Sequence, residues 1–243
     1  MEITSVNNLF IKQLKKEKAK NRFLLFLDTP ILIEEALNHN LTLKHILIQK
    51  DKQYNFVSKF RDKVIFVSKE VLAQLSSVVT SAGVLGVFEF EKKPYKAPQG
   101  NYLVLDNLQD AGNVGTLLRT ALAANFKTVF LLDCASITNE KVIRSSAGAL
   151  FSLFVHEMTR KEFLQNFTLN NLYVADMDGK NIFKEKPNGN IGLALGNEGN
   201  GVSEEIVKAA QGKTVSLPME NNLESLNVAV SGAIIMYLIN FGG

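Results

Sequence analysis

The chain has 243 residues, 46% of them hydrophobic and 21% charged, which are ordinary proportions for a globular protein. One cysteine, Cys134, excludes an intrachain disulfide, and three scattered histidines argue against a histidine-rich centre, so we expect no structural metal. The most apolar stretch, residues 228–239, is too short to span a bilayer, and lysines interrupt the N-terminus where a signal peptide would be apolar. We therefore expect a cytoplasmic protein with no membrane partner.

The first ninety residues alternate between predicted helices and strands. Residues 5–22 are basic with a partial apolar face, which predicts a short basic helix. Strands are predicted at 23–27, 44–49, 64–67 and 84–90, and helices at 31–37, 54–61 and 68–76. Pro30 suits the first turn of one helix, and Ser68 is a candidate N-cap of another. This alternation predicts a small α/β sandwich.

The net charge of +3 is unevenly distributed along the chain. Residues 1–100 carry 16 Lys and Arg against 10 Asp and Glu, whereas residues 101–243 carry 11 against 14. A basic first part favours contact with a polyanion such as nucleic acid, although a lysine-rich surface that only confers solubility has the same composition. Residues 92–100 contain two prolines, a glycine and three lysines, the composition of a linker. We therefore expect two domains, residues 1–96 and 97–243.

The second part of the chain also alternates. Strands are predicted at 102–106, 128–132, 151–156, 172–176, 191–195 and 214–217, and helices at 112–124, 139–150, 203–210 and 225–241. This pattern predicts an α/β domain with a mostly parallel sheet that helices cover on both faces. In such sheets ligands bind at the carboxyl ends of the strands.

Three loops at predicted strand ends are rich in polar residues and glycine. The first, residues 107–115, leads into the helix that carries Arg119. The second, residues 195–201, holds three glycines, which permit positive φ and close approach of the main chain to a ligand. The third, residues 218–227, leads into the last helix. Each loop alone is a weak signal, because Asn, Asp and Gly are ordinary turn formers and Ser225 could simply cap a helix.

Together, and in this order, the loops resemble the SpoU (TrmH) branch of the SPOUT superfamily of RNA 2′-O-ribose methyltransferases. The matching residues are Asn107, Asp110, Asn113-Val114-Gly115 and Arg119; then Leu195-Gly196-Asn197-Glu198-Gly199-Asn200-Gly201; then Leu217-Pro218-Met219 and Ser225-Leu226-Asn227-Val228. Three ordered motifs at matching separations over residues 101–240 make the resemblance specific. The family usually has glycine where Asn221 stands, and asparagine tolerates a left-handed conformation better than most residues.

Residues 5–90 more loosely resemble the ribosomal protein L30e-like domain that often precedes the catalytic domain of this family. That domain more commonly has an acidic residue followed by glycine where Asp28-Thr29 stands. The resemblance implies that residues 1–96 bind RNA and that residues 97–243 form the SPOUT catalytic domain. It also implies a C-terminal trefoil knot, which composition and periodicity could not show, since unknotted chains are the strong default.

The resemblance further implies methylation of a ribose 2′-hydroxyl in RNA, with S-adenosylmethionine as cofactor and a homodimer as the active form. Ribosomal RNA is favoured over transfer RNA as the partner, and the target nucleotide is not identified. Arg119 is implied as the central catalytic residue, and Glu198, Ser225 and Asn227 would orient substrate and donor. Asn113 would help to fix Arg119 or the adjoining subunit. Because the pKa of arginine lies above about 12, we expect Arg119 to hold a phosphate and stabilise oxyanion charge rather than to act as a base.

The implied cofactor site is formed by the second and third loops, whose glycines expose main chain to the adenine while leucine and methionine side chains enclose it. Its expected residues are Leu195, Gly196, Asn197, Glu198, Gly199, Gly201, Leu217, Met219, Ser225, Leu226 and Asn227.

Two other functions compete with this one. A nicotinamide-dependent enzyme is disfavoured because Glu204 and Glu205 would repel a phosphate at their helix N-terminus, and because the glycines do not follow the first strand of the sheet. A non-catalytic RNA-binding scaffold of the same fold should have lost Arg119 or the second motif, and both are present.

Overall fold

The computed structural model describes residues 2–20, 23–78, 81–91, 93–95, 97–167, 171–185, 187–221 and 225–242. The chain divides into two compact units, residues 1–92 and 93–243. The division falls within the lysine- and proline-rich segment that was expected to be the linker. The separate roles expected of the two parts remain predictions.

The N-terminal unit contains a five-stranded mixed sheet. Its elements are β1 (Glu2–Ile3), α1 (Leu9–Lys20), β2 (Leu24–Leu27), α2 (Pro30–Asn38), β3 (Leu43–Ile48), the 3-10 helix η1 (Asn55–Lys63), β4 (Val64–Val67), α3 (Lys69–Ala73) and β5 (Val84–Glu89). The strand order is β1-β4-β3-β5-β2, in which β1, β4 and β3 are parallel and β5 is antiparallel to both of its neighbours. The sequence did not predict the two-residue β1, and the helix expected at 54–61 is a 3-10 helix kinked at Phe60.

Local chemistry explains the helix starts in this unit. Thr29 and Ser68 cap α2 and α3 by accepting hydrogen bonds from the backbone N–H groups of Leu32 and Val71. Asp28, at the end of β2, is buried and accepts hydrogen bonds from the hydroxyls of Ser76 and Ser77 at 3.1 and 3.2 Å. The acidic residue at this position therefore ties β2 to the segment after α3.

The C-terminal unit contains a six-stranded sheet with every strand pair parallel. Its elements are β6 (Tyr102–Asp106), α4 (Ala111–Ala123), β7 (Thr128–Leu132), α5 (Glu140–Ser146), α6 (Ala149–Ser152), β8 (Phe154–Met158), α7 (Arg160–Asn166), β9 (Leu172–Asn181), β10 (Gly192–Gly196), α8 (Glu204–Ala209), β11 (Thr214–Ser216) and α9 (Val228–Phe241). The order is β11-β9-β10-β6-β7-β8. The predicted α/β class and the mostly parallel sheet are confirmed.

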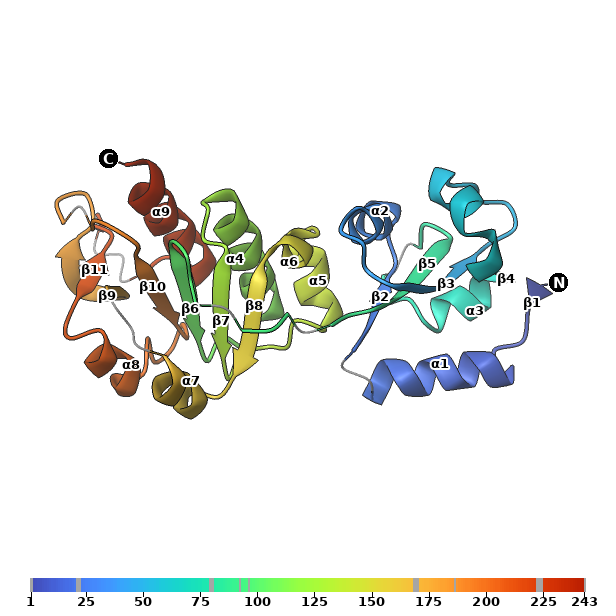
Figure 1. Cartoon of the computed structure of the whole chain (residues 1–243), viewed down its shortest axis with the longest axis horizontal. Coiled ribbons are helices and arrows are strands. Elements are labelled where there is room, and N and C mark those ends of the chain that lie inside the picture. Colours follow the sequence, from blue (N-terminus) through green and yellow to red (C-terminus); the bar gives the residue numbers. More distant parts are fainter. Residues whose placement is uncertain are drawn as a thin grey trace. The chain divides into compact units, whose positions relative to one another are not determined.

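Helices cover both faces of this sheet (Figure 1). On one face Phe163 of α7 and Ile206 of α8 share a core with Val104 and Phe130. On the other face α4 and α9 lie together, with α5 and α6 beside α4. Gly232 of α9 allows the close approach, because a Cβ there would lie 2.4 Å from a methyl carbon of Leu195. Strands β6 and β7 are buried along their whole length, which explains why they read as continuous apolar runs.

Several element boundaries differ from the prediction. The helix expected at 139–150 is two helices, because Ala147 and Gly148 both adopt left-handed conformations, with φ of 48° and 84°. Helix α7 was not predicted, although Thr159 and Glu162 form a capping box at its start. The last helix begins at Val228 rather than Ser225, since Asn227 is its N-cap. No helix in the described parts of the chain is long and apolar enough to cross a membrane.

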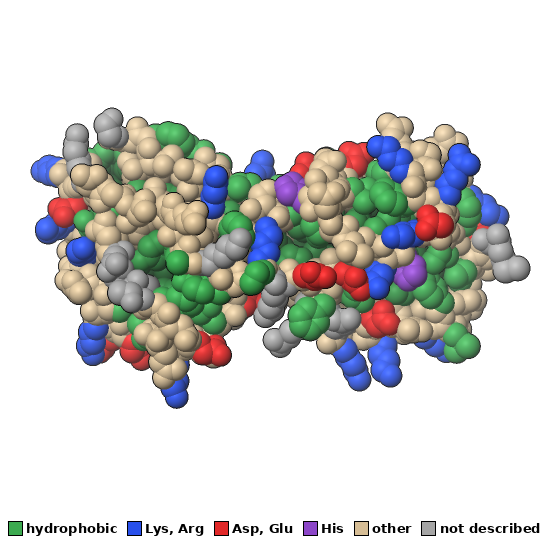
Figure 2. Space-filling view, viewed as in Figure 1, with side chains coloured by type: hydrophobic (Ala, Val, Ile, Leu, Met, Phe, Trp, Pro, Cys, Tyr) green, Lys and Arg blue, Asp and Glu red, His purple; other side chains and the backbone are tan. Residues whose placement is uncertain are grey.

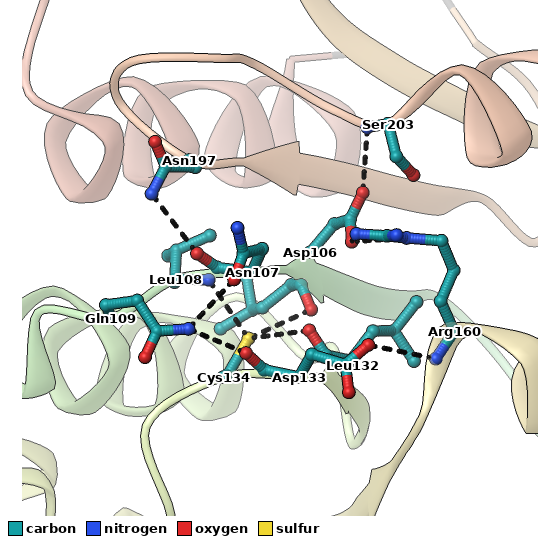
Figure 3. A network of polar contacts seen from close by, with 11 residues as sticks. Asp106, Asn107, Leu108, Gln109, Leu132, Asp133, Cys134, Arg160, Asn197 and Ser203 are labelled. Carbon is teal, nitrogen blue, oxygen red and sulfur yellow. Dashed lines mark hydrogen bonds and ion pairs between the residues drawn. The ribbon is translucent and has the colours of Figure 1, made fainter.

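The Asp106 carboxylate joins three segments of the C-terminal unit (Figure 3). It lies at the end of β6 with its side chain only 1% exposed. One oxygen accepts hydrogen bonds from Nε and Nη2 of Arg160 at 3.0 and 2.8 Å, and the other accepts from the backbone N–H of Ser203 at 2.8 Å. The ion pair raises the pKa of Arg160. The carboxylate thus ties β6 to the first turn of α7 and to the chain just before α8.

We predict that Asp106→Asn lowers the free energy of unfolding by about 1.5–3 kcal/mol, because hydrogen bonds to a charged group contribute that much and an amide cannot replace the ion pair. Urea unfolding of the wild type, Asp106→Asn, Arg160→Gln and the double variant measures the coupling. We expect a coupling energy of about 1–3 kcal/mol. Asp178→Asn, an exposed carboxylate on β9, is the matched control and should unfold like the wild type. A coupling energy near zero would show that the pair stabilises nothing.

Candidate active site

A cleft of about 760 Å³ opens where β9, β10 and β11 meet the start of α9. Four segments line it: residues 175–177 in β9, 195–202 from the end of β10 onward, 215–219 from within β11 onward, and residues 225, 226, 228, 231 and 235 at or just before α9. All the expected cofactor-site residues except Asn227 lie among them. The second and third loops therefore form one site.

The second loop is held in a tight backbone turn. Asn197 and Gly201 exchange two backbone hydrogen bonds of 3.1 and 2.8 Å across it. A Cβ on Gly196 would lie 2.1 Å from the carbonyl carbon of Gly201, and Gly201 itself has a φ of +67°. The Asn197 side chain accepts from the N–H of Gly199 at 2.8 Å and donates to the carbonyl of Asn107 at 3.2 Å. Gly196 and Gly201 are thus required by the turn, and Asn197 connects it to the first loop.

The third loop contains the one departure from the family motif within the site. Asn221 has a φ of 58°, the left-handed conformation that glycine adopts most easily. Asparagine tolerates this conformation better than most residues. The three residues that follow it lie outside the described residues.

Asn113 connects the three loops. Its side-chain nitrogen donates a hydrogen bond to the Glu198 carboxylate in the second loop. Its side-chain oxygen accepts one from the Asn227 side chain at 3.2 Å. Asn227 in turn accepts from the backbone N–H of Ala229 at 2.9 Å, so that it also caps α9. The expected contact between Asn113 and Arg119 is not formed within this chain, and Asn113 instead fixes Glu198 and Asn227.

Arg119 lies apart from the cleft. It is exposed on α4 and is not among the residues that line the cleft. Among the described residues, none forms a hydrogen bond or ion pair with its guanidinium group. Six residues along a helix place it about 9 Å beyond Asn113 and on a different side of α4. Within one copy of the chain, Arg119 is thus separate from the cleft and from the linked side chains of Asn113, Glu198 and Asn227.

Sequence reasoning missed one wall of the cleft, the segment Ala175-Asp176-Met177. The pairing of β9 with β10 ends at Val174, just before this segment, and β9 itself continues to Asn181. The segment therefore lies beside the end of β10, where the cleft opens. Asp176 accepts a hydrogen bond from the backbone N–H of Asp178 at 2.9 Å. Asp176 and Glu198 are the charged side chains among the described residues that line the cleft, and no Lys, Arg or His is among them.

Cys134 lies beside the first loop, but its chemistry is structural. Its Sγ accepts from the N–H of Leu108 at 3.3 Å and donates to the carbonyl of Leu105 at 3.1 Å (Figure 3). Burial raises the pKa of this thiol to about 12, so it stays protonated and is a poor nucleophile. No group of His, Cys, Asp and Glu suited to a metal ion is found among the described residues.

Comparison with known proteins identifies the family. The model of the SpoU rRNA methylase family matches residues 100–237. An uncharacterized tRNA/rRNA methyltransferase of Synechocystis sp. is 30% identical over 97% of this chain and 92% of its own length. A 23S rRNA (guanosine(2553)-2′-O)-methyltransferase of Bacillus subtilis is 28% identical over 92% of this chain and 90% of its own.

Solved structures resemble the whole chain as well. A crystal structure of an RNA 2′-O ribose methyltransferase has a TM-score of 0.81 at 26% identity, covering 98% of this chain and 97% of that one. An AdoMet-bound rRNA methyltransferase from Sinorhizobium meliloti has a TM-score of 0.84 at 21% identity, covering 98% and 96%, which bears on the fold alone. Since the family model matches more than half of the sequence, the chain belongs to the SpoU rRNA methylase family, within the SPOUT superfamily.

Proposed function

We propose that this protein is an RNA 2′-O-methyltransferase that uses S-adenosylmethionine and acts on ribosomal RNA. The observation that carries the proposal is the meeting of Asn113, Glu198 and Asn227 beside a cleft of nucleoside size. Relatives named as 23S rRNA 2′-O-methyltransferases support the ribose of ribosomal RNA as the acceptor. Transfer RNA is the second candidate substrate, since the Synechocystis relative is named for both RNAs. A cytoplasmic location is part of the same proposal.

The residues of the cleft fit S-adenosylmethionine. Leu195, Leu217 and Leu226 offer apolar surface for an adenine, and the backbone of the tight second loop offers hydrogen-bonding groups. Two carboxylates and no cationic side chain among the described lining residues suit a ligand without phosphate and with a positive charge. When bound, this cofactor supplies a methyl group carried on a positively charged sulfur.

We predict that Asp176→Asn weakens binding of S-adenosylmethionine by about three- to tenfold. The carboxylate attracts the sulfonium, and solvent screening limits the effect because Asp176 is exposed. S-adenosylhomocysteine lacks the sulfonium charge, so its affinity should change by less than about twofold. Isothermal titration calorimetry with both ligands measures the two ratios, and Asp178→Asn is the control. Equal losses for the two ligands would rule out charge as the cause.

The cleft and Arg119 divide the work of the reaction. A ribose hydroxyl is a poor nucleophile, so the site must hold it in line and accommodate loss of its proton. Glu198, held by Asn113, and Ser225 at the cleft wall would orient the acceptor and the donor. Arg119 would bind the RNA phosphate beside that hydroxyl and stabilise the negative charge that develops on its oxygen.

We predict that Arg119→Ala lowers kcat/KM for methyl transfer to RNA by about 100- to 1,000-fold, the loss typical of removing one such charge-stabilising group. The Kd for S-adenosylmethionine should stay at the wild-type value, because Arg119 does not line the cleft. Transfer of labelled methyl groups to ribosomal RNA and calorimetry measure the two quantities. Lys208→Ala removes an exposed cation from α8 and serves as the control. Full methylation by Arg119→Ala with intact donor binding would refute this role.

The active form is proposed to be a homodimer. On α9, Val230, Ile234, Tyr237 and Phe241 are 48%, 38%, 47% and 61% exposed, and their spacing of three and four residues places them in one stripe. An apolar stripe of this kind is typical of a protein interface. A second copy would cover the stripe, and its approach would supply the cleft with an arginine that its own chain does not place there.

We predict that Ile234→Asp shifts the protein from dimer to monomer in sedimentation velocity experiments, because the interface would bury an unpaired carboxylate. Methyl transfer should fall with the dimer fraction. Ile31→Asp, at an exposed isoleucine of α2 in the N-terminal unit, is the matched control and should leave the dimer intact. A dimer that persists in Ile234→Asp at micromolar concentration would place the interface elsewhere.

The trefoil knot and the L30e-like character of the N-terminal unit belong to the same proposal. The knot is supported by the path of α9, which follows the edge strand β11 yet packs against β10 inside the sheet. The basic composition of residues 1–100 supports an RNA-binding role for the N-terminal unit.

A further inference from the structure

The five lysines of α1 are sorted by the fold into two groups. The inner side of the helix buries Ile11 and Leu14 in the core of the N-terminal unit. Lys15 and Lys18 lie toward this side: Lys15 donates to the side chain of Gln74 and Lys18 to the carbonyl of Leu75. Lys18 also lies 5.6 Å from the ring centroid of Phe26. These two lysines are therefore used in packing α1 against the rest of the unit.

The other three, Lys12, Lys16 and Lys20, form an exposed row that we call the outer row. They are four residues apart, so each ammonium group follows the last by about 6 Å along the helix axis. None of the three forms an ion pair or hydrogen bond with a described residue. Glu17, the acidic residue of α1, lies to one side of the row and accepts a hydrogen bond from Gln13 at 3.0 Å. The outer row is thus a line of three cations without a neutralising partner among the described residues.

The surface view shows basic side chains on this side of the unit. Lys and Arg side chains project from the lower edge of the N-terminal unit in Figure 2, where Figure 1 draws α1. The outward side of the helix carries Leu9 as its one large apolar residue, since the remaining apolar side chains face the core. A helix that lies on a membrane needs an apolar face free for the lipid, and here that face is already buried.

We propose that the outer row binds the phosphate backbone of the RNA substrate, so that α1 positions the RNA without reading its bases. This inference rests on the proposed function, because it takes RNA as the substrate. Lysine ammonium groups act as point charges on phosphates, and such contacts fix the position of a nucleic acid rather than its sequence. Beside the outer row, α1 exposes no aromatic side chain and one amide, Gln13. Stacking on bases and base-specific hydrogen bonds are therefore not favoured at this surface.

The test is the salt dependence of RNA binding by the full chain carrying Lys12→Gln, Lys16→Gln and Lys20→Gln together. Each lysine–phosphate contact contributes about 0.7–0.9 to the slope of log Kobs against log salt concentration. The triple variant should therefore lose about 2–2.7 from that slope and bind about 100-fold more weakly at 0.1 M salt. Filter binding of an in vitro transcript of bacterial 23S rRNA, from 0.05 to 0.3 M KCl, gives both values.

A matched variant tests whether the position of the lysines, rather than the net charge of the protein, determines RNA binding. Lys161→Gln, Lys180→Gln and Lys208→Gln together remove three exposed lysines from the C-terminal unit. This variant should keep a slope within about 0.5 of the wild type. Equal losses of slope in the two triple variants would show that net charge alone is responsible and would overturn the proposal. Unchanged melting temperatures in both variants would confirm that the exposed lysines do not hold the fold together.

Two further readouts distinguish this inference from the proposed function. The outer-row variant should bind S-adenosylmethionine with the wild-type Kd, since its substitutions are in another unit. If the wild type binds and methylates the RNA and the outer-row variant keeps the full slope, the row is not the contact surface, while the methyltransferase assignment stands. If the wild type binds S-adenosylmethionine but shows no affinity for RNA, both the outer row and the proposed substrate class are wrong.

Discussion

The site depends on a carboxylate that is not part of it. Asp106 is almost fully buried, and a buried charge is tolerated only with a complete set of partners. Its partners, Arg160 and the N–H of Ser203, come from two segments that are distant in the sequence. The first loop begins where Asp106 ends its strand, and the second loop ends near Ser203. One buried carboxylate, through its hydrogen bond from Ser203, therefore joins the start of the first loop to the end of the second, the two loops that carry Asn113 and Glu198.

Much of the fold could be predicted because apolar runs indicate the buried strands and turn residues indicate where they end. The parallel strands β6 and β7 are buried on both faces and appear as uninterrupted apolar segments. Asn221, which stands where the family usually has glycine, adopts a left-handed conformation that asparagine tolerates better than most residues. The break between α5 and α6 was not predicted, since Ala147 is a good helix former and yet adopts a left-handed conformation.

The loops of the candidate site could be predicted from the sequence, but the cleft wall formed by residues 175–177 could not. The three motifs are contiguous in sequence, so their residues could be named before the fold was known. Asp176 lies inside β9, which continues past it to Asn181, and only the end of pairing with β10 makes it part of the cleft. Helix α7, by contrast, carried a readable signal in Thr159 and Glu162 that hydrophobic periodicity concealed.

The opposite charges of the two ligands explain why the polar chemistry is divided within the chain. A sulfonium donor would be attracted by Asp176 and Glu198 in a cleft whose described residues include no cation, and a phosphate in the same place would be repelled. RNA needs the reverse, and the cations proposed to meet it, Arg119 and the lysines of α1, lie outside the cleft. The excess of basic residues in the first hundred positions and of acidic residues after them follows the same division. Within one chain the two kinds of charge therefore lie apart, and in the proposed homodimer the second copy would bring an arginine to the cleft together with the RNA.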